Sequence, residues 1–375
     1  MKAKIIDIID ISEWEELPQP TEGTRDKCIV QSPDGITYYF KTSLKKTPSN
    51  GQVREYRHEF WSEVIACRIA SLLGFNALRY DVAYRKEDDE TLVGCISQSM
   101  ISEGQSLISG FNLIVGYLPT FRVDYKKEHR LPLICQTLEH YGLSKYRHKI
   151  IECLVLDAII GNADRHSENW AMISRVRYEE VNDILDETKP QTDFNKSGLT
   201  DNLKEPRKNK KLVLSDKGEE EVEQEGNISK WKAEEWLGQY MSLAPIYDSG
   251  SSLGREYTDD KLQVKLDNGG LNEYIEKGKP DIQIKESGKK RTFLKCIEDL
   301  CQDYKDDMKQ IYEQSLSQLD CKQIDKMLDI LDQDARGIIP EELCLSSVRK
   351  DFISRLINGR VERIKRIIQE HVPVS

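Results

Sequence analysis

The chain has 375 residues, a formal net charge of −10, 38% hydrophobic residues and 32% charged residues. This acidic balance argues against a general affinity for nucleic acid or for an anionic membrane surface. No apolar run is long enough to cross a bilayer, and the N-terminus lacks the apolar core of a signal peptide, so we expect a cytoplasmic protein.

The nine cysteines are odd in number, and no two of them have the Cys-x-x-Cys spacing. Several, such as Cys67 and Cys153, fall in apolar stretches with helical periodicity. We therefore expect free thiols in a reducing compartment rather than a disulfide framework or a zinc site.

The first hundred residues are predicted to form a small β-rich lobe. Residues 28–42 carry β-branched and aromatic runs on either side of a Pro-Asp-Gly turn, which is the pattern of a hairpin. Apolar residues then recur every three or four positions over 53–73, which predicts an amphipathic helix that ends at Gly74. Further strands are expected at 82–84 and 92–101.

From about residue 105 onward the sequence pattern becomes helical. The clearest predicted helices are 131–141 and 145–160, and the segments 297–333 and 344–370 are also expected to be helical. One apolar stripe runs along the last of these, which predicts packing against a core.

Residues 176–230 differ from the rest of the chain in composition. They are rich in Asp, Glu, Lys, Asn, Ser and Gly, with a basic cluster followed by an acidic one. Such a segment cannot bury enough apolar area to order itself, so we expect an exposed, partly disordered insertion.

The segment from Gly161 to Trp170 carries the strongest chemical signal. Asp164 is followed five positions later by Asn169. Kinase catalytic loops use this spacing, because the Asp accepts a proton from the incoming hydroxyl and the Asn holds Mg²⁺. The sequence therefore predicts a phosphotransferase. His166 is either a second general base or a scaffold for the loop backbone, and the scaffold role is favoured.

Phosphoryl transfer also needs a cradle and a cation for the triphosphate. The candidate cradle lies just before the predicted hairpin, where Gly23 allows close backbone approach and Thr24 and Lys27 offer donors. The candidate cation is Lys41, which follows an aromatic strand and matches the lysine that contacts the α- and β-phosphates in kinases.

A kinase lysine of this kind is usually paired with a glutamate on the next helix. Glu63 is favoured as the partner of Lys41. Glu59 lies one turn earlier on the same predicted face, so the sequence leaves this choice open.

Asp248 is the candidate for a second metal ligand. An apolar stretch from Leu243 to Tyr247 is expected to be a strand that delivers this Asp, and small residues then turn the chain. Mg²⁺ prefers oxygen ligands and retains water, so Asn169, Asp248 and the phosphates of ATP would suffice to hold it.

Together, these segments resemble HipA-like serine/threonine kinases. The segment from Gly161 to Trp170 is similar to the catalytic loop of that family, and the segment from Leu243 to Gly254 is similar to its magnesium-binding segment. The stretches 23–27, 38–41 and 63–74 are similar to its N-lobe.

The resemblance implies an α+β, bilobal protein-kinase-like fold, with a β-rich N-lobe at 1–104 and a helical C-lobe at 105–375. It implies ATP and Mg²⁺ as cofactors and a protein Ser or Thr as the acceptor. The roles that it implies are Asp164 as catalytic base, Asn169 and Asp248 as metal ligands, Lys41 as the ATP lysine, Lys27 in the phosphate loop, and Ser99, Ile101 and Glu103 in the adenine-binding hinge, by position only.

Toxin members of the family pair with a DNA-binding antitoxin and can target an aminoacyl-tRNA synthetase. The phosphate loop here begins by residue 23, so the extra N-terminal subdomain of full-length toxins is expected to be missing or to be encoded separately. A small partner protein is therefore a weaker expectation than the kinase activity. Self-phosphorylation, which occurs on the phosphate loop in this family, would fall on Thr21 or Thr24, where negative charge would repel ATP.

Two other functions remain open from the sequence. The pattern Asp-Arg-His-x-x-Asn is also similar to the loop of phosphatidylinositol kinases, although an acidic chain without a lipid anchor disfavours a lipid substrate. A pseudokinase that serves as a binding module is the other alternative. It is disfavoured because every predicted polar catalytic position is filled.

Overall fold

The computed structural model describes residues 5–18, 27–43, 45–46, 54–88, 90–121, 129–175, 240–286 and 289–374. The chain divides into two compact units. The first unit consists of Met1–Met100, His148–His166 and Pro245–Ser375, and the second consists of Ile101–Arg147 and Ser167–Ala244. The predicted insertion at 176–230 lies outside the described residues, and the predicted lobe boundary at 104 stays a prediction.

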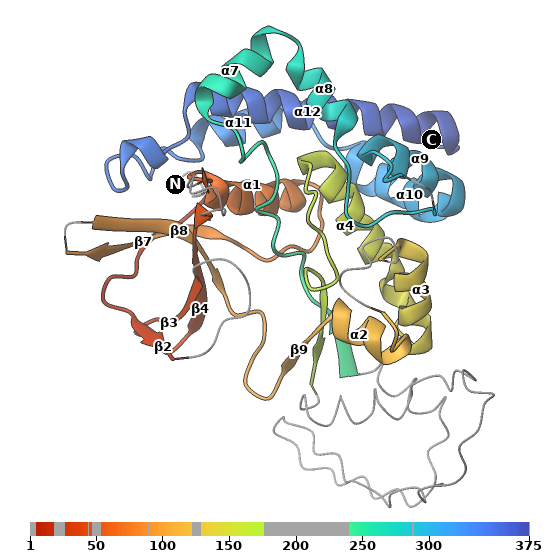
Figure 1. The fold of residues 1–375 in the computed structure, drawn as a ribbon, viewed down its shortest axis with the longest axis horizontal. Coiled ribbons are helices and arrows are strands. Elements are labelled where there is room, and N and C mark those ends of the chain that lie inside the picture. The colour runs from red at the N-terminus through yellow and green to blue at the C-terminus, as the bar shows by residue number, and fades with distance from the viewer. Residues whose placement is uncertain are drawn as a thin grey trace, which may run out of the picture. The chain divides into compact units, whose positions relative to one another are not determined.

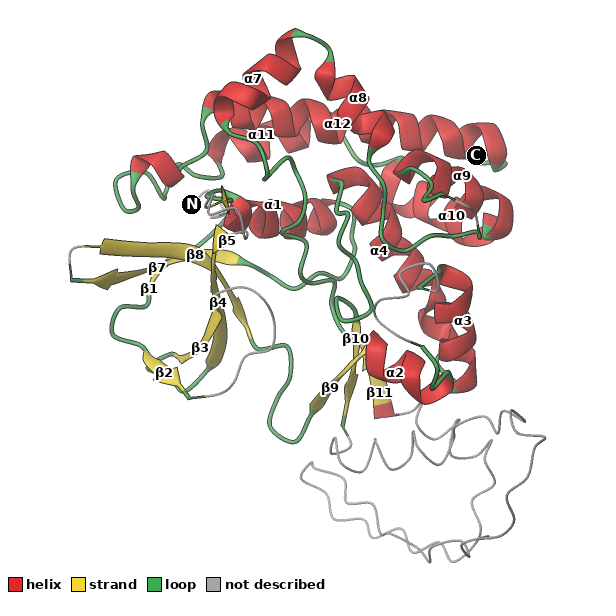
Figure 2. Ribbon diagram, in the orientation of Figure 1, coloured by secondary structure: helices red, strands yellow, loops and turns green. Residues whose placement is uncertain are grey.

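The first unit contains a mixed six-stranded sheet (Figure 2). The strand order is β1-β7-β8-β4-β3-β2, with β1 parallel to β7 and every other neighbouring pair antiparallel. The strands are β1 (Ile8–Asp10), β2 (Glu15–Leu17), β3 (Lys27–Gln31), β4 (Thr37–Thr42), β7 (Asp81–Glu87) and β8 (Glu90–Gln98).

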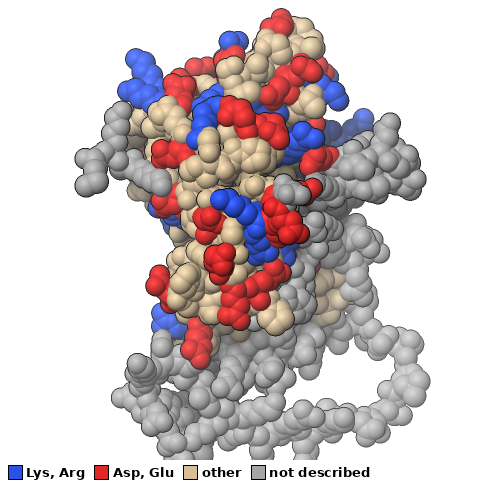
Figure 3. All heavy atoms as spheres, turned by 90° about the vertical axis from the view of Figure 1, so that its left-hand side faces the viewer, with Lys and Arg blue, Asp and Glu red and all other residues tan. Residues whose placement is uncertain are grey.

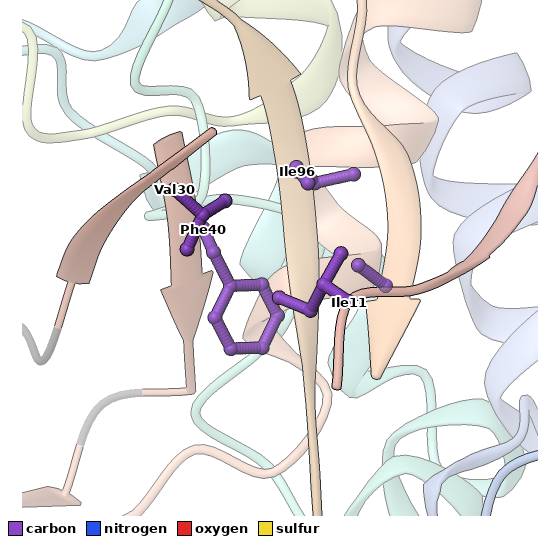
Figure 4. Close-up of a cluster of buried hydrophobic side chains, with 5 residues drawn as sticks. Ile11, Val30, Phe40 and Ile96 are labelled. Atoms are coloured by element: carbon purple, nitrogen blue, oxygen red, sulfur yellow. The ribbon is translucent and has the colours of Figure 1, made fainter. Parts of the chain in front are cut away.

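The predicted hairpin is confirmed as β3 and β4. Its turn is closed by a hydrogen bond from the Gly35 amide to the Ser32 carbonyl (2.8 Å), and Gly35 has a φ of 79°, which favours glycine. Alternate residues of these strands point into one apolar cluster, which Figure 4 shows in close-up. Its members are Ile11, Val30, Phe40, Ala83 and Ile96.

The predicted amphipathic helix is α1 (Glu59–Leu72), and Gly74 follows its end with a φ of 73°. The predicted start at residue 53 is wrong. Arg54–Glu55 instead forms the short strand β6, paired with β5 (Lys45–Lys46). The first buried residues of the helix are Glu59 and Phe60, so its periodic buried face starts six residues later than predicted.

Helices form most of the remaining described part of the first unit (Figure 1). The segment 297–333, which was predicted to be helical, is interrupted at Tyr304 and again at 317–320. The helices are α4 (Arg147–Ile160), α7 (Asp259–Asp267), α8 (Gly270–Lys277), α9 (Phe293–Asp303), α10 (Lys305–Ile311), the π-helical turn Tyr312–Leu316, α11 (Cys321–Ile330), the 3₁₀ turn Glu341–Leu343 and α12 (Ser347–His371).

The second unit is built on a three-stranded antiparallel sheet in the order β11-β10-β9. Gly110 stands where β9 meets the next helix, and an added Cβ there would lie 2.0 Å from the Trp170 ring, so only glycine fits. The elements are β9 (Ser106–Ser109), α2 (Gly110–Tyr117), α3 (Leu131–His140), the 3₁₀ turn Ser144–Tyr146, β10 (Ala171–Ser174) and β11 (Met241–Leu243).

On the face drawn in Figure 3, acidic and basic side chains are interspersed, with no broad field of one sign. All nine cysteines are free in the structure. Within the described residues, no helix combines the length and the apolar character that a membrane span requires.

Candidate active site

The catalytic-loop segment begins where α4 ends. Gly161 has a φ of 76° and donates its amide to the carbonyl of Asp157 (2.8 Å), and the Asn162 amide donates to the same carbonyl (3.0 Å). The Asn162 side chain also donates to the carboxylate of Asp157 (3.0 Å) and accepts from the Asp164 amide (3.3 Å). The backbone that leads to Asp164 is thus fixed by a buried carboxylate of the preceding helix.

The buried guanidinium of Arg165 connects this loop to the segment around Asp248. Its Nε and Nη2 atoms donate to the two carboxylate oxygens of Asp157 (2.9 and 2.8 Å), in the bidentate geometry that makes such pairs strong. It also donates to the Tyr247 carbonyl and to Ser249 Oγ (3.0 Å). Burial opposes its charge, but Asp157 raises the pKa of Arg165 well above its usual range, so the guanidinium stays charged.

Arg165, which follows Asp164 in the chain, therefore donates hydrogen bonds to both residues that flank Asp248. A second contact joins the Asp164 carboxylate to the segment that carries Asp248. The Ser251 hydroxyl donates to Asp164 Oδ2 (3.2 Å), and Ser251 lies three residues after Asp248. The two predicted acidic groups are held by one hydrogen-bonded network within the first unit.

The Asp248 segment has an unusual backbone. Asp248 and Leu253 have φ values of 54° and 56°, in the left-handed region that side chains other than glycine rarely adopt. The amide of Leu253 is anchored to the Ile160 carbonyl at the end of α4 (3.1 Å). Such outliers concentrate at functional sites, which points to this turn as one.

The strand predicted from Leu243 to Tyr247 is wrong, because the strand here is β11 (Met241–Leu243) and shares only Leu243 with the predicted range. β11 ends at Leu243, and beyond it Ile246 makes an isolated bridge with Ala77. Pro245 cannot donate to a strand ladder, which explains why regular pairing stops there.

Lys41 lies on β4 between two acidic side chains. Its Nζ is 3.4 Å from Asp248 Oδ1 and 3.8 Å from Glu63 Oε1, and it lies over the Tyr80 ring at 5.5 Å. Burial lowers the pKa of Lys41, but Tyr80 and the two carboxylates raise it well above its usual range. Because burial also raises the pKa of the Tyr80 phenol, the two carboxylates supply the negative charge that keeps the lysine protonated.

Glu63 connects α1 to both of these elements. Its Oε1 faces Lys41, and its Oε2 accepts the Ser249 amide at 2.7 Å. Glu59 instead pairs with Arg255. Of the two glutamates that the sequence left open, Glu63 is the one that contacts Lys41.

Lys27 lies directly opposite Lys41 in the β3–β4 pair, so the two lysines project from the same face of the sheet. Two like charges at such a position are unfavourable unless anionic groups lie close by. Glu63 and Asp248 supply such groups beside Lys41.

A further buried cation supports the start of the loop. Arg360, on α12, donates to the Ala158 carbonyl (2.9 Å) and to the Tyr274 carbonyl (3.3 Å). An added Cβ at Gly161 would lie 2.6 Å from Arg360 Nη1, so a larger residue would strain the positive-φ backbone and displace this guanidinium.

No family model and no curated protein sequence matches the chain. Among solved structures, the crystal structure of the Helicobacter pylori proinflammatory kinase CtkA matches with a TM-score of 0.64 and 15% identity, covering 98% of this chain and 100% of that one. This chain has the fold of a kinase. The predicted α+β, protein-kinase-like fold is therefore confirmed.

Two other solved structures match more weakly. A chain from the Shewanella oneidensis MR-1 complex of HipA, HipB and operator DNA has a TM-score of 0.44 and 10% identity, covering 95% of this chain and 67% of that one. Golgi casein kinase has a TM-score of 0.32 and 10% identity, covering 97% and 73%. Scores this low do not support a fold assignment by themselves.

Within the kinase fold, the first unit brings together Lys41, Glu63, Asp164 and Asp248, whose catalytic roles stay predictions. Asn169 is buried and belongs to the second unit, so its convergence with Asp248 also stays a prediction. The predicted hinge spans the boundary between the units, with Ser99 in the first unit and Ile101 and Glu103 in the second. Gly23 and Thr24 lie outside the described residues.

Sequence reasoning missed the residues that hold the site together. Asp157 was overlooked, although a carboxylate within the apolar run from Ile150 to Ile160 is a signal of a buried, paired acid. Ser249 and Ser251 gave no such signal, because serines in a turn usually serve the turn alone.

Arg165→Met is expected to lower the free energy of unfolding by about 3–5 kcal/mol, because it leaves the Asp157 carboxylate buried without its charged partner. Urea denaturation measures this change. Arg355→Met, which breaks the exposed ion pair with Asp351, serves as the control and should cost no more than about 1 kcal/mol. Equal losses in the two variants would contradict the proposed importance of the Arg165 network.

Proposed function

We propose that this chain is an ATP- and Mg²⁺-dependent phosphotransferase that phosphorylates Ser or Thr residues of proteins. The observation that carries the proposal is the contact of Lys41 with Asp248, 207 residues away in the chain, next to the Glu63 ion pair. A phosphate-binding lysine, its helix glutamate and a carboxylate for the metal are the parts that kinases share.

The residues present fit ATP and Mg²⁺. Lys41 and Lys27 supply two cations on one face of the sheet for the phosphates. The Asp248 side chain is 23% exposed, which leaves its carboxylate accessible to an ion. The described residues contain no group of three or more His, Cys, Asp or Glu side chains that could hold a metal. Asp248, Asn169, phosphate oxygens and water would form the kind of site that Mg²⁺ prefers.

In the proposed reaction, the acceptor hydroxyl gives its proton to the Asp164 carboxylate as its oxygen forms a bond to the γ-phosphorus of ATP. The bond from that phosphorus to the bridging oxygen breaks, and ADP leaves. Lys41 would hold the phosphates in line, and Glu63 would hold Lys41. When bound, Mg²⁺ would neutralise the charge that develops on the phosphate oxygens.

Asp164 already accepts one hydroxyl, that of Ser251. This contact supports a role for the carboxylate as an acceptor of hydroxyl protons. His166 donates its backbone amide to the Asp164 carbonyl (3.0 Å), and the favoured scaffold role of its side chain stays a prediction.

The proposal is tested by incubating the purified protein with γ-labelled ATP, Mg²⁺ and each of three acceptors. These are a lysate of the source organism, a mixture of purified Ser- and Thr-rich proteins, and vesicles that contain phosphatidylinositol. We expect label on protein, at phosphoserine or phosphothreonine. Lys41→Met should reduce the transfer by about 100-fold, because a fixed cation at the phosphates is lost.

Each contrary outcome identifies an alternative. Label on vesicles alone would identify a lipid kinase. ATP binding without transfer to any acceptor, unchanged in Asp164→Asn, would identify a pseudokinase.

The toxin role and the small partner protein stay predictions from the resemblance. The Shewanella structure contains HipA together with HipB, which is the kind of partner in question. Co-purification of a small protein with the tagged chain from its own organism would support this prediction. Self-phosphorylation of Thr21 or Thr24 concerns residues outside the described ones and also stays a prediction.

A further inference from the structure

Glu59 is a buried carboxylate for which the proposed reaction has no use. It lies in the first turn of α1, 2% exposed, one helical turn before Glu63. An acidic side chain is favourable at a helix N-terminus, but a buried one also needs a partner. That partner is Arg255.

Arg255 belongs to the segment that carries Asp248. It follows Gly254, and its guanidinium also lies over the ring of Tyr56, 4.9 Å from the ring centre. The side chain is 17% exposed and that of Glu59 is 3% exposed, so the ion pair is largely shielded from water. In such surroundings the loss of one charge leaves the other one uncompensated.

The Glu59 pair is one of three contacts between the same face of α1 and the same segment. Ser62 Oγ donates to the Ser252 carbonyl (3.2 Å), and Glu63 Oε2 accepts from the Ser249 amide (2.7 Å). Positions 59, 62 and 63 share one face because the helix repeats every 3.6 residues. The three contacts therefore set both the rotation of α1 and its position along the segment.

We propose that Arg255 and Glu59 are positioning residues that hold α1 so that Glu63 reaches Lys41. The proposal rests on the proposed function, because it assigns the regulation of the ATP-binding lysine to this ion pair. Neither residue touches the reacting groups. Their effect passes through the helix: a small rotation at Glu59 moves Glu63, one turn later, away from the Lys41 ammonium.

The test uses the chemical reactivity of Lys41, which needs neither ATP nor turnover. Lys41 and Lys350 have side chains that are 15% and 16% exposed, and each is paired with a carboxylate. Lys350 on α12 donates to the Asp332 carboxylate and to the Asp329 carbonyl, neither of which belongs to α1, so it is a matched internal control. Reductive methylation with formaldehyde, followed by mass spectrometry, gives the ratio of the two modification rates.

We expect Arg255→Gln and Glu59→Gln each to raise the ratio of Lys41 to Lys350 methylation by about tenfold, the order of coupling found between residues in contact. Arg291→Gln breaks a comparable pair with Asp299 and should leave the ratio unchanged. A substitution that only destabilised the fold would raise the methylation rates of Lys41 and Lys350 together and leave their ratio constant. Arg255→Lys, which keeps the charge, should return the ratio most of the way to that of the unaltered protein.

Kinetics provide the second measurement. Arg255→Gln should raise the KM for ATP by about tenfold with a smaller change in kcat, because it acts on the lysine that binds the phosphates. An unchanged methylation ratio in both Arg255→Gln and Glu59→Gln would overturn the positioning role, even if phosphotransfer is observed. If the protein transfers no phosphate at all, the proposed function fails, while the methylation ratio still decides whether this pair positions Lys41.

Discussion

Asp164→Asn is expected to lower kcat by about 10²- to 10⁴-fold, the usual contribution of a positioned general base. The amide has nearly the same shape and still accepts the Ser251 hydroxyl, but it cannot take up the proton of the acceptor. The network of Asp157, Asn162 and Arg165 does not involve the Asp164 carboxylate, so the loop should keep its conformation. Binding of ATP should therefore change by no more than about twofold.

Steady-state kinetics and calorimetric titration with ATP measure these two quantities. Glu168→Gln removes an exposed carboxylate from the neighbouring sequence and is the matched control, with activity close to that of the unaltered protein. If Asp164→Asn retained a third or more of the activity, the substitution would raise the activation free energy by only roughly 0.6 kcal/mol or less. Asp164 would then not be the base.

Asp248→Asn is expected to raise the Mg²⁺ concentration for half-maximal activity by at least about 100-fold, since changes in residues that only support metal ligands already cost about 10–100-fold. Asn is the replacement that isolates the charge, because it tolerates the left-handed φ of 54° at this position. Excess Mg²⁺ should restore part of the activity.

A Mg²⁺ titration of activity at saturating ATP measures this shift. Asp281→Asn alters a buried acid that is paired with Lys290, and it should leave the Mg²⁺ dependence unchanged. An identical Mg²⁺ requirement in Asp248→Asn and the unaltered protein would remove Asp248 from the metal site. The proposed kinase reaction would then lose its main structural support.

The sequence predicted those elements whose ends are fixed by a few neighbouring residues. The hairpin of β3 and β4 followed from a Pro-Asp-Gly turn, and the end of α1 followed from Gly74, because both glycines adopt a positive φ that other residues avoid. The apolar stripe of α12 likewise followed from helical periodicity, and its core-facing side chains are buried.

Elements that depend on distant partners were not predictable in the same way. β1 pairs in parallel with β7 across more than seventy residues, and a three-residue strand has no distinct pattern of its own. The sheet of β9, β10 and β11 unites segments from both sides of the charged region that follows residue 175. Pairings of this kind are decided by packing in the folded chain.

The candidate site likewise contains residues that the sequence could predict and residues that it could not. Motif spacing identified Asp164 and Asp248 as acidic groups of interest, and the order of elements identified Lys41 and Glu63. The sequence could not reveal that Arg165 bridges Asp157 and Ser249, because that contact joins residues 84 positions apart. The sequence carried one signal for Arg360, because this residue stands at a position of the apolar stripe of α12. In the structure its side chain is buried there.

The support that Arg360 gives to the start of the catalytic loop has a consequence for protein synthesis. The carbonyl that Arg360 binds belongs to Ala158, which the ribosome adds 202 residues earlier. At a translation rate of about 5–20 residues per second, the loop exists for roughly 10–40 s before its arginine is made. During that time the nascent chain carries Asp164 without the Arg360 contact that supports the loop. Competence for phosphoryl transfer is therefore expected to arise only after α12 has been synthesised and has docked.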